Sequence, residues 1–275
     1  MSFLRKREDK LMAPTPMILL TNDDGVHDPG LLVLRRALAA LGEVVVFAPD
    51  HNWSAAGHTK TMHKPLRVAE VRLADGSLAL TTSGTPSDCV GLALLGLIRA
   101  HPDLVVSGIN DGPNLGADIT YSGTVASAME AAINGIPAIA ASLDWGQDRD
   151  LELAADLTAM LAARVLANGL PAQTFLNLNV PSLPRARWRG LRVTRLGQRV
   201  YRDVLIERTD PRGQPYYWIG GKAPTGLPDP DADTDIGALA EGYASVTPLN
   251  MDMTDKDFLP TLRQWDLTWE GSTRP

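Results

Sequence analysis

Two adjacent carboxylates, Asp23 and Asp24, stand directly after a short apolar run in the stretch TNDDGVHDPG. Neighbouring carboxylates repel each other and resist removal from water, so their position at the end of a buried strand needs an explanation. A solvated turn is one explanation, and a bound cation that compensates both charges is the other. Ser54 and Asn110, in two later loops, add a hydroxyl and an amide oxygen. An all-oxygen set of this kind suits a hard divalent cation such as Mg²⁺ or Mn²⁺.

The second stretch that could carry chemistry is YSGTVASAMEAA, in which Ser122, Gly123 and Thr124 precede a helical pattern. Exposed N–H groups and the positive end of the helix dipole favour a phosphate group at such a position. A serine or threonine that only caps the helix would leave the same pattern. The sequence has no P-loop and no clean GxGxxG, so neither nucleoside triphosphate hydrolysis nor dinucleotide binding has support from a motif.

Other polar residues give weaker indications. Three histidines share one region but match no familiar zinc spacing, and they are interpreted as surface residues: His51, His58 and His63. His27 and Asp28 lie beside the aspartate pair, and His27 could assist acid–base chemistry. GTPSDCV predicts a turn and a helix cap, with Cys89 packed on the helix.

The elements that must position these residues alternate along the chain. Apolar runs predict buried strands at 17–20, 43–49, 77–82, 103–108, 137–142 and 174–180. Apolar residues at helical spacing predict helices at about 31–41, 87–99, 123–136 and 151–167. Strands that alternate with helices are typical of an α/β fold, in which a mostly parallel sheet is covered on both faces.

Polar, glycine-rich loops follow four of the predicted strands. These loops are NDDG, PDHNWSAAGHT, SGTPSD and SGINDGPNLG. Parallel strands place their carboxyl ends at one edge of the sheet, and ligands bind at that edge near a topological switch point. Four such loops at one edge indicate a site rather than four unrelated turns.

The chain divides into three parts. Residues 1–16 contain basic residues and no apolar signal-peptide core, and we expect a short mobile extension there. Residues 17–189 are predicted to form the α/β core. In residues 190–275, two β-rich segments around DPRG predict a hairpin, which a Pro/Asp-rich loop and one more short strand follow.

The predicted hairpin carries more aromatic surface than a solvated arm should expose. Its aromatic residues are Tyr201, Tyr216, Tyr217 and Trp218. An isolated hairpin is marginally stable in water. We therefore expect it to pack on, or exchange with, a second subunit in a homo-oligomer.

The composition excludes several classes of protein. The 275 residues are 44% hydrophobic and 21% charged, as in an ordinary globular protein. A net charge of −6 argues against a nucleic-acid duplex or an anionic membrane as partner. Cys89 is the single cysteine, so internal disulfides and a cysteine-based zinc site are excluded. No stretch approaches the roughly 20 apolar residues of a membrane span. We expect a cytoplasmic protein.

Six stretches, in order, resemble the SurE family of stationary-phase survival proteins. They are ILLTNDDGV, VVVFAPDHNWSAAGHT, GTPSDCV, DLVVSGINDGPNLGADITYSGTVASAMEAAINGIPAIAAS, DPRGQPYYWIGG and TDIGALAEGYASVTPL. The resemblance runs from about residue 17 to the C-terminus. It implies a Rossmann-like three-layer core, a swapped C-terminal extension that makes a homodimer or homotetramer, and a 5′-nucleotidase. Such an enzyme is a metal-dependent phosphoric monoester hydrolase that acts on nucleoside monophosphates.

The resemblance also assigns residues. The family's metal ligands, for one Mg²⁺ or Mn²⁺ per subunit, fall on Asp23, Asp24, Ser54 and Asn110, and we expect Asp23, Asp24 and Asn110 to be catalytic. The phosphate-contacting segment falls on Ser122, Gly123 and Thr124, and the pocket-lining positions fall on Asn52 and Asn114. Where relatives often carry a histidine, this chain has Gly237, so no role of that histidine is carried over.

Several alternatives remain open from the sequence. We favour direct attack by water on the phosphate, and an aspartyl-phosphate on Asp23 is the second mechanism. A non-catalytic nucleotide-binding or regulatory protein could keep the same pocket, and a nucleotide-sugar transferase also places an aspartate pair beside an α/β sheet. The preferred base, the 5′ or 3′ position of the phosphate, and activity on short polyphosphate stay undetermined.

Overall fold

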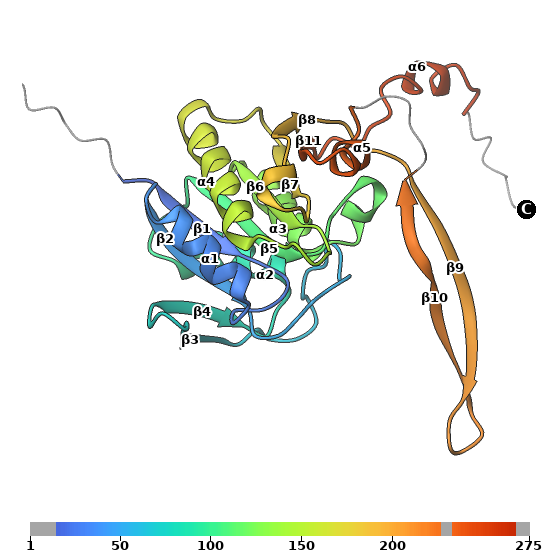
Figure 1. The fold of residues 1–275 in the computed structure, drawn as a ribbon, viewed down its shortest axis with the longest axis horizontal. Coiled ribbons are helices and arrows are strands. Elements are labelled where there is room, and N and C mark those ends of the chain that lie inside the picture. Colours follow the sequence, from blue (N-terminus) through green and yellow to red (C-terminus); the bar gives the residue numbers. More distant parts are fainter. Residues whose placement is uncertain (1–14, 227–232, 268–275) are drawn as a thin grey trace, which may run out of the picture.

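The structure is a computed structural model that describes residues 15–226 and 233–267. Within these residues, six strands run parallel through the centre of the molecule (Figure 1). In spatial order they are β4 (Leu78–Thr82), β2 (Glu43–Pro49), β1 (Met17–Thr21), β5 (Leu104–Asp111), β6 (Ala138–Leu143) and β7 (Thr174–Val180). The predicted α/β fold with a mostly parallel sheet is therefore confirmed.

Three more strands extend the sheet at its two edges. β3 (Val68–Arg72) pairs antiparallel with β4 at one edge, while β11 (Ala244–Asn250) pairs antiparallel with β7 at the other. β8 (Leu191–Val193) lies outside β11 and runs parallel to it. The sequence pattern does not predict β3, because VAEVR is largely exposed and lacks the apolar run of a central strand.

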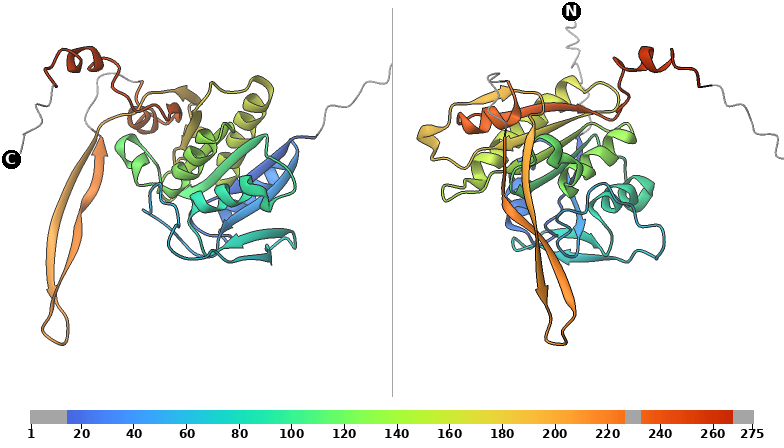
Figure 2. Two further views of the ribbon diagram at one scale, coloured as in Figure 1. Left: turned by 180° about the vertical axis from the view of Figure 1, so that it is seen from behind. Right: turned by 90° about the vertical axis from the view of Figure 1, so that its right-hand side faces the viewer.

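Helices cover both faces of the sheet and complete three layers (Figures 1 and 2). α1 (Pro29–Leu38) and α4 (Leu151–Asn168) pack together on one face. α2 (Pro86–Leu92) and α3 (Gly123–Ile133) pack together on the other face. No helix of the described residues is long and apolar enough to cross a membrane.

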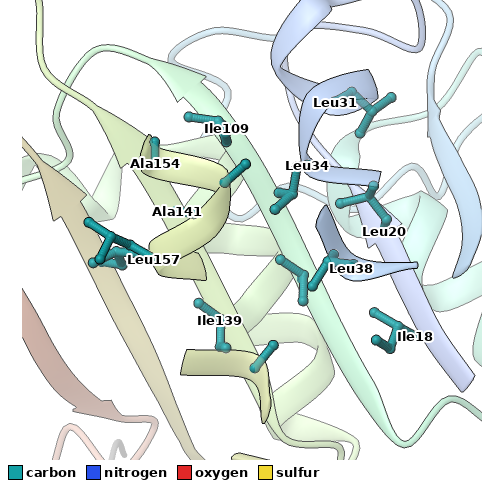
Figure 3. Packing of buried hydrophobic residues seen from close by; sticks show 14 of the residues in the cluster. Ile18, Leu20, Leu31, Leu34, Leu38, Ile109, Ile139, Ala141, Ala154 and Leu157 are labelled. Carbon is teal, nitrogen blue, oxygen red and sulfur yellow. The ribbon is translucent and has the colours of Figure 1, made fainter. Parts of the chain in front are cut away.

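β1 shows why the central strands carry apolar residues at consecutive positions. Ile18 and Leu20 belong to the cluster that Leu31, Leu34 and Leu38 of α1 cover, as Figure 3 shows. The alternate residues of the strand, Met17 and Leu19, belong to the cluster on the opposite face, which includes Cys89 and Val125. Successive side chains of a strand point to opposite faces, so a strand covered on both faces needs an uninterrupted apolar run.

Two predicted helix boundaries differ from the structure for local reasons. The first helix begins at Pro29, because the carboxylate of Asp28 accepts a hydrogen bond from the Gly30 N–H at 2.7 Å and caps it. A helix is predicted over 87–99, but the α-helical part ends at Leu92. A π-helical turn then continues to Leu97, where Gly96 has a φ of 104°. A left-handed residue cannot continue an α-helix.

The predicted hairpin is present as β9 (Arg199–Thr209) and β10 (Pro215–Gly226), an antiparallel ribbon that projects away from the core (Figures 1 and 2). After it, α5 (Asp235–Ala240) and β11 return to the core, and α6 (Leu259–Leu262) follows. Most of the predicted N-terminal extension, and positions 227–232 of the Pro/Asp-rich loop, lie outside the described residues.

Candidate active site

The loops after β1, β2, β4 and β5 meet at the carboxyl edge of the sheet. The chain leaves β1 toward β2 on one side and later returns to β5 on the other, which makes β1 the switch point. Backbone hydrogen bonds tie the loops together: Trp53 N–H donates to the Asp23 carbonyl at 2.7 Å, and Asp50 N–H donates to the Thr82 carbonyl at 2.9 Å. The predicted convergence of these loops is confirmed.

Asp23 is a buried carboxylate, with 3% of its surface exposed. Burial raises the pKa of Asp23 above its ordinary value, and a hydrogen bond from the Thr124 hydroxyl opposes the rise. The N–H groups of Gly123 and Thr124 act in the same direction as that hydroxyl. The group that lies against the first turn of α3 in this structure is therefore the carboxyl group of Asp23.

Asp24 is partly buried and lies beside this carboxylate. Asn52 Nδ2 donates to Asp24 Oδ1 at 3.0 Å, and the Asp111 N–H donates to Oδ2 at 3.3 Å. Burial, and then the charge of Asp23, raise the pKa of Asp24 to about 6. Within residues 15–220 and 233–267, no lysine, arginine or histidine forms an ion pair with either carboxylate. No positive side chain among these residues therefore compensates charge on the pair.

A cavity of about 250 Å³ brings Asp23 together with Ser54 and Asn110. The Asn110 Nδ2 donates to the Gly112 carbonyl at 2.7 Å, so the amide oxygen Oδ1 is the atom available to a ligand. Two carboxylates, a hydroxyl and an amide oxygen are the ligand types of a hard divalent cation. Since the described residues place no three His, Cys, Asp or Glu side chains around a common metal position, a cation here would depend on the neutral oxygens of Ser54 and Asn110.

The three residues predicted to contact phosphate have different positions. Ser122 lines the cavity, and its hydroxyl also accepts a hydrogen bond from the Val125 N–H at 3.1 Å as the cap of α3. Thr124 is fully buried and donates its hydroxyl to Asp23. A Cβ added at Gly123 would lie 2.7 Å from the Cβ of Asp23. The glycine is therefore required by the packing of Asp23, and the contact of these residues with phosphate stays a prediction.

Asn114 also lines the cavity, and buried polar residues hold it in place. Its Nδ2 donates to Ser142 Oγ at 2.8 Å, and its N–H donates to Asn179 Oδ1 at 2.7 Å. Its carbonyl accepts from Asn177 and Asn179 at 2.9 and 3.0 Å. The sequence interpretation does not include these supports, although two asparagines inside the buried strand TFLNLNV are the signal that points to them.

The appended C-terminal part contacts the turn that forms one wall of this cavity. Asp118 lines it from the 3₁₀ turn Gly116–Thr120 and accepts hydrogen bonds from Arg199 Nε at 2.6 Å and from the Tyr201 hydroxyl, both on β9. The Gly116 N–H donates to the buried carboxylate of Asp235, on α5, at 2.8 Å. The hairpin and α5 therefore help to fix the loop that forms one wall of the cavity.

Two residues beside the aspartate pair take no visible part in the site. His27 is exposed, and Asp28 caps α1. Among the other histidines, His51 and His63 are exposed as expected. His58 is exposed as well, and its Nε2 lies 3.0 Å from a carboxylate oxygen of Glu130.

Glu130 fastens the loop that carries Ser54 to α3. Its side chain is buried, and its two oxygens lie 3.0 Å from His58 Nε2 and 2.9 Å from Lys60 Nζ. The hydrogen bond with His58, followed by the one from Lys60, lowers the pKa of Glu130 to about 2. The same helix begins at Ser122, so this cluster links the two sides of the cavity.

We expect Glu130→Gln to lower the melting temperature at pH 7. A folded pKa of about 2 lies below the ordinary 4.5, so the carboxylate contributes stability that is present above pH 4.5 and is lost as the pH falls toward 2. A hydrogen bond that involves a charged group, such as the one between this carboxylate and the Lys60 ammonium group, is worth roughly 1.5–3 kcal/mol. Thermal unfolding followed by circular dichroism should show a large difference from wild type at pH 7 and a smaller one at pH 3.

Glu152→Gln provides the matched control, since Glu152 is an exposed carboxylate in the first turn of α4. This variant should melt close to wild type at both pH values. A Glu130→Gln deficit of the same size at pH 7 and pH 3 would contradict the ion-pair role.

The chain is similar to proteins of one family. A family model described as "Survival protein SurE" matches residues 18–203. The protein named 5′-nucleotidase SurE of Herpetosiphon aurantiacus is 55% identical over 247 residues, which are 89% of this chain and 96% of that protein. Its namesake in Chloroflexus aggregans is 51% identical over 255 residues, 92% of this chain and 99% of that protein. The crystal structure of the SurE protein from Aquifex aeolicus matches with a TM-score of 0.77 and 42% identity, and covers 90% of this chain and 98% of that one.

Proposed function

This chain belongs to the SurE family, and on that premise we propose that it is a 5′-nucleotidase, which hydrolyses nucleoside 5′-monophosphates to nucleoside and phosphate. The observation that carries the proposal is the carboxylate pair of Asp23 and Asp24, of which Asp23 lines a cavity together with Ser54 and Asn110. Relatives that are named 5′-nucleotidase SurE match over nearly their whole length, which supports the same activity here.

We further propose that each subunit uses one divalent cation, Mg²⁺ or Mn²⁺. The ligands would be Asp23, Asp24, Ser54 and Asn110. The fit rests on the charge of the pair and on the oxygen-only donors. When bound, the cation would neutralise charge on the phosphate and make a neighbouring water more acidic.

The residues of the chain orient the reacting groups. The Thr124 hydroxyl holds Asp23, while Asn52 and the Asp111 N–H hold Asp24. We assign the phosphate to the region between Asp23 and Ser122, where the Ser122 hydroxyl lines the cavity and can donate a hydrogen bond to a phosphoryl oxygen. Because Asp23 is buried and already hydrogen-bonded, direct attack by water is favoured over an aspartyl-phosphate.

The alternative functions have less support. A non-catalytic nucleotide-binding or regulatory protein would have no need of an uncompensated carboxylate pair. This chain has the pair and also the other two candidate ligands, Ser54 and Asn110. A nucleotide-sugar transferase has no counterpart among the matched relatives described above. 3′-Nucleotides and short polyphosphate remain candidate further substrates, and the cytoplasmic location remains a prediction.

The test is a phosphate-release assay with the four common nucleoside 5′-monophosphates, each with Mg²⁺, Mn²⁺ or EDTA. We expect release with at least one of the two ions and none with EDTA. The corresponding 3′-monophosphates and tripolyphosphate, assayed beside them, define the substrate range. If neither ion supports release from any nucleoside monophosphate, the proposed function is wrong.

We propose that the β9–β10 hairpin packs on a second subunit and gives a homodimer or a homotetramer. In the single chain the ribbon exposes Leu205, Trp218 and Ile219, the last with 82% of its surface accessible. A two-stranded ribbon with such apolar surface gains stability when another chain covers it.

Light scattering at micromolar concentration should give two or four times the chain mass of 29.6 kDa. The double variant Trp218→Lys with Ile219→Lys should shift the mass toward a single chain, because two buried charges would oppose the contact. Leu95→Lys is the control and should keep the parental mass. Leu95 is an apolar residue on the surface of the α/β part of the chain and is as exposed as Ile219. A wild-type mass of one chain would contradict this assembly.

A further inference from the structure

Two exposed aromatic side chains line the cavity that contains Asp23. They are Trp145, in the loop after β6, and Tyr121, directly before Ser122. Trp145 has 58% of its surface exposed and Tyr121 has 62%. Neither residue belongs to the ligand set or to the supports described above. Large aromatic side chains normally contribute to a core or an interface, so their exposure on the wall of a polar cavity needs an explanation.

Trp145 is exposed but held in a defined position. Its Nε1 donates to the Asp111 carbonyl at 3.1 Å, and its N–H donates to Asp144 Oδ1 at 2.8 Å. The indole ring lies against Gly112, where an added Cβ would come within 2.5 Å of ring atoms Cε2 and Cζ2. Gly112 also has a φ of 125°, which favours glycine. The ring is thus fixed to the backbone that directly follows Asn110.

This arrangement differs from that of a structural tryptophan. A structural indole lies mostly in the core, whereas Trp145 contributes only one edge to the loop and leaves most of its surface to solvent. Its polar N–H is already satisfied, so what the exposed part offers to a ligand is an apolar aromatic surface. An aromatic ligand can stack on such a surface without any rearrangement of the protein.

We propose that Trp145, together with Tyr121, forms the platform on which the nucleobase of the substrate stacks. The inference rests on the proposed nucleotidase function and concerns how the same cavity recognises the rest of the substrate. A phosphate placed between Asp23 and Ser122 leaves the nucleoside to extend along the cavity walls that these two residues line. Because every base has a π-face, stacking selects nucleosides over other alcohols and discriminates weakly among bases.

The variant Trp145→Ala should raise KM for AMP and GMP about tenfold and leave kcat within about twofold, as expected when ground-state and transition-state binding are lost equally. KM for glycerol phosphate, a phosphomonoester without a base, should stay unchanged. Trp145→Phe should retain most of the affinity for nucleotides, and Tyr121→Leu should give a smaller rise in KM for nucleotides alone. Trp265→Ala, at an exposed tryptophan that does not line the cavity, is the control with parental kinetics.

A second readout does not depend on turnover. Adenosine, the product without phosphate, should quench part of the tryptophan fluorescence of wild type, and this part should be absent in Trp145→Phe. If wild type releases no phosphate from any nucleotide, the proposed function fails. If wild type is active but Trp145→Ala keeps the parental ratio of kcat/KM for AMP to that for glycerol phosphate, or if Trp145→Phe keeps the quenching by adenosine, only the base platform fails.

Discussion

Asp23→Asn and Asp24→Asn are each expected to lower kcat/KM for nucleoside monophosphates at least about a hundredfold, while the fold survives. Each carboxylate supplies negative charge to the proposed cation site, and loss of the cation removes several kcal/mol of stabilisation from the transition state. Steady-state phosphate release measures the effect. The same two carboxylates repel each other without a cation, and their mutual charge contributes to the raised pKa of Asp24. The melting temperature in EDTA should therefore be equal to that of wild type or higher.

Three comparisons make this prediction specific. EDTA should abolish wild-type turnover, and added Mn²⁺ or Mg²⁺ should restore it, but the same ions should not rescue either variant. Asp148→Asn, which neutralises an exposed carboxylate in the loop after β6, should keep parental kinetics. Full activity of a wild-type preparation shown by elemental analysis to contain no divalent metal would overturn the assignment.

The second large effect is expected from Gly123→Ala, a change of one methyl group. The added Cβ would lie 2.7 Å from the Asp23 Cβ and 2.9 Å from Asp23 Oδ2, closer than side-chain atoms normally approach. Since Asp23 is buried, it can move only by giving up its hydrogen bond with Thr124. We expect a loss of at least about a hundredfold in kcat/KM and weaker Mn²⁺ binding by calorimetry, with a cost in stability of about 1–3 kcal/mol from overpacking.

Gly91→Ala is the matched control for this substitution. Gly91 also lies in a helix, but a Cβ there would have its nearest contact with the Lys60 side chain at 3.8 Å. This variant should be active and somewhat more stable, since alanine is favoured over glycine within helices by roughly 1 kcal/mol. Thr124→Val, which keeps the shape of the residue and removes the hydroxyl, should fall between the two, about tenfold to a hundredfold below wild type. Parental kinetics and parental Mn²⁺ affinity in Gly123→Ala would contradict this account.

Local patterns in the sequence were sufficient for the architecture and for the location of the site. Apolar runs at 17–20, 43–49 and 103–108 identify central strands, because a strand buried on both faces is composed mainly of apolar residues. Parallel strands then place their following loops at one edge, whatever the detailed geometry of each loop. Asp23, Ser54 and Asn110 could be brought together on these grounds alone, and the structure places them around one cavity.

Elements that depend on tertiary contacts were not predictable in the same way. β3 forms because β4 offers an unpaired edge, although β3 itself is mostly exposed. Asn177 and Asn179 lie inside a buried strand because the Asn114 loop, more than sixty residues earlier, supplies their hydrogen-bond partners. Trp145 is recognisable as part of the cavity wall only once its loop is known to lie against Gly112.

The start of α3 shows most clearly which properties the sequence determines and which depend on the tertiary structure. The sequence by itself determined that Ser122, Gly123 and Thr124 begin a helix and that its N–H groups favour an anion, since both properties are local. Only the tertiary structure decided that the acidic group in contact is the side chain of Asp23, which is 101 residues from Thr124 in the chain. Which side chain meets a helix end depends on the order and register of the strands in the sheet, and these arise from packing of the whole core rather than from the spacing of residues along the chain.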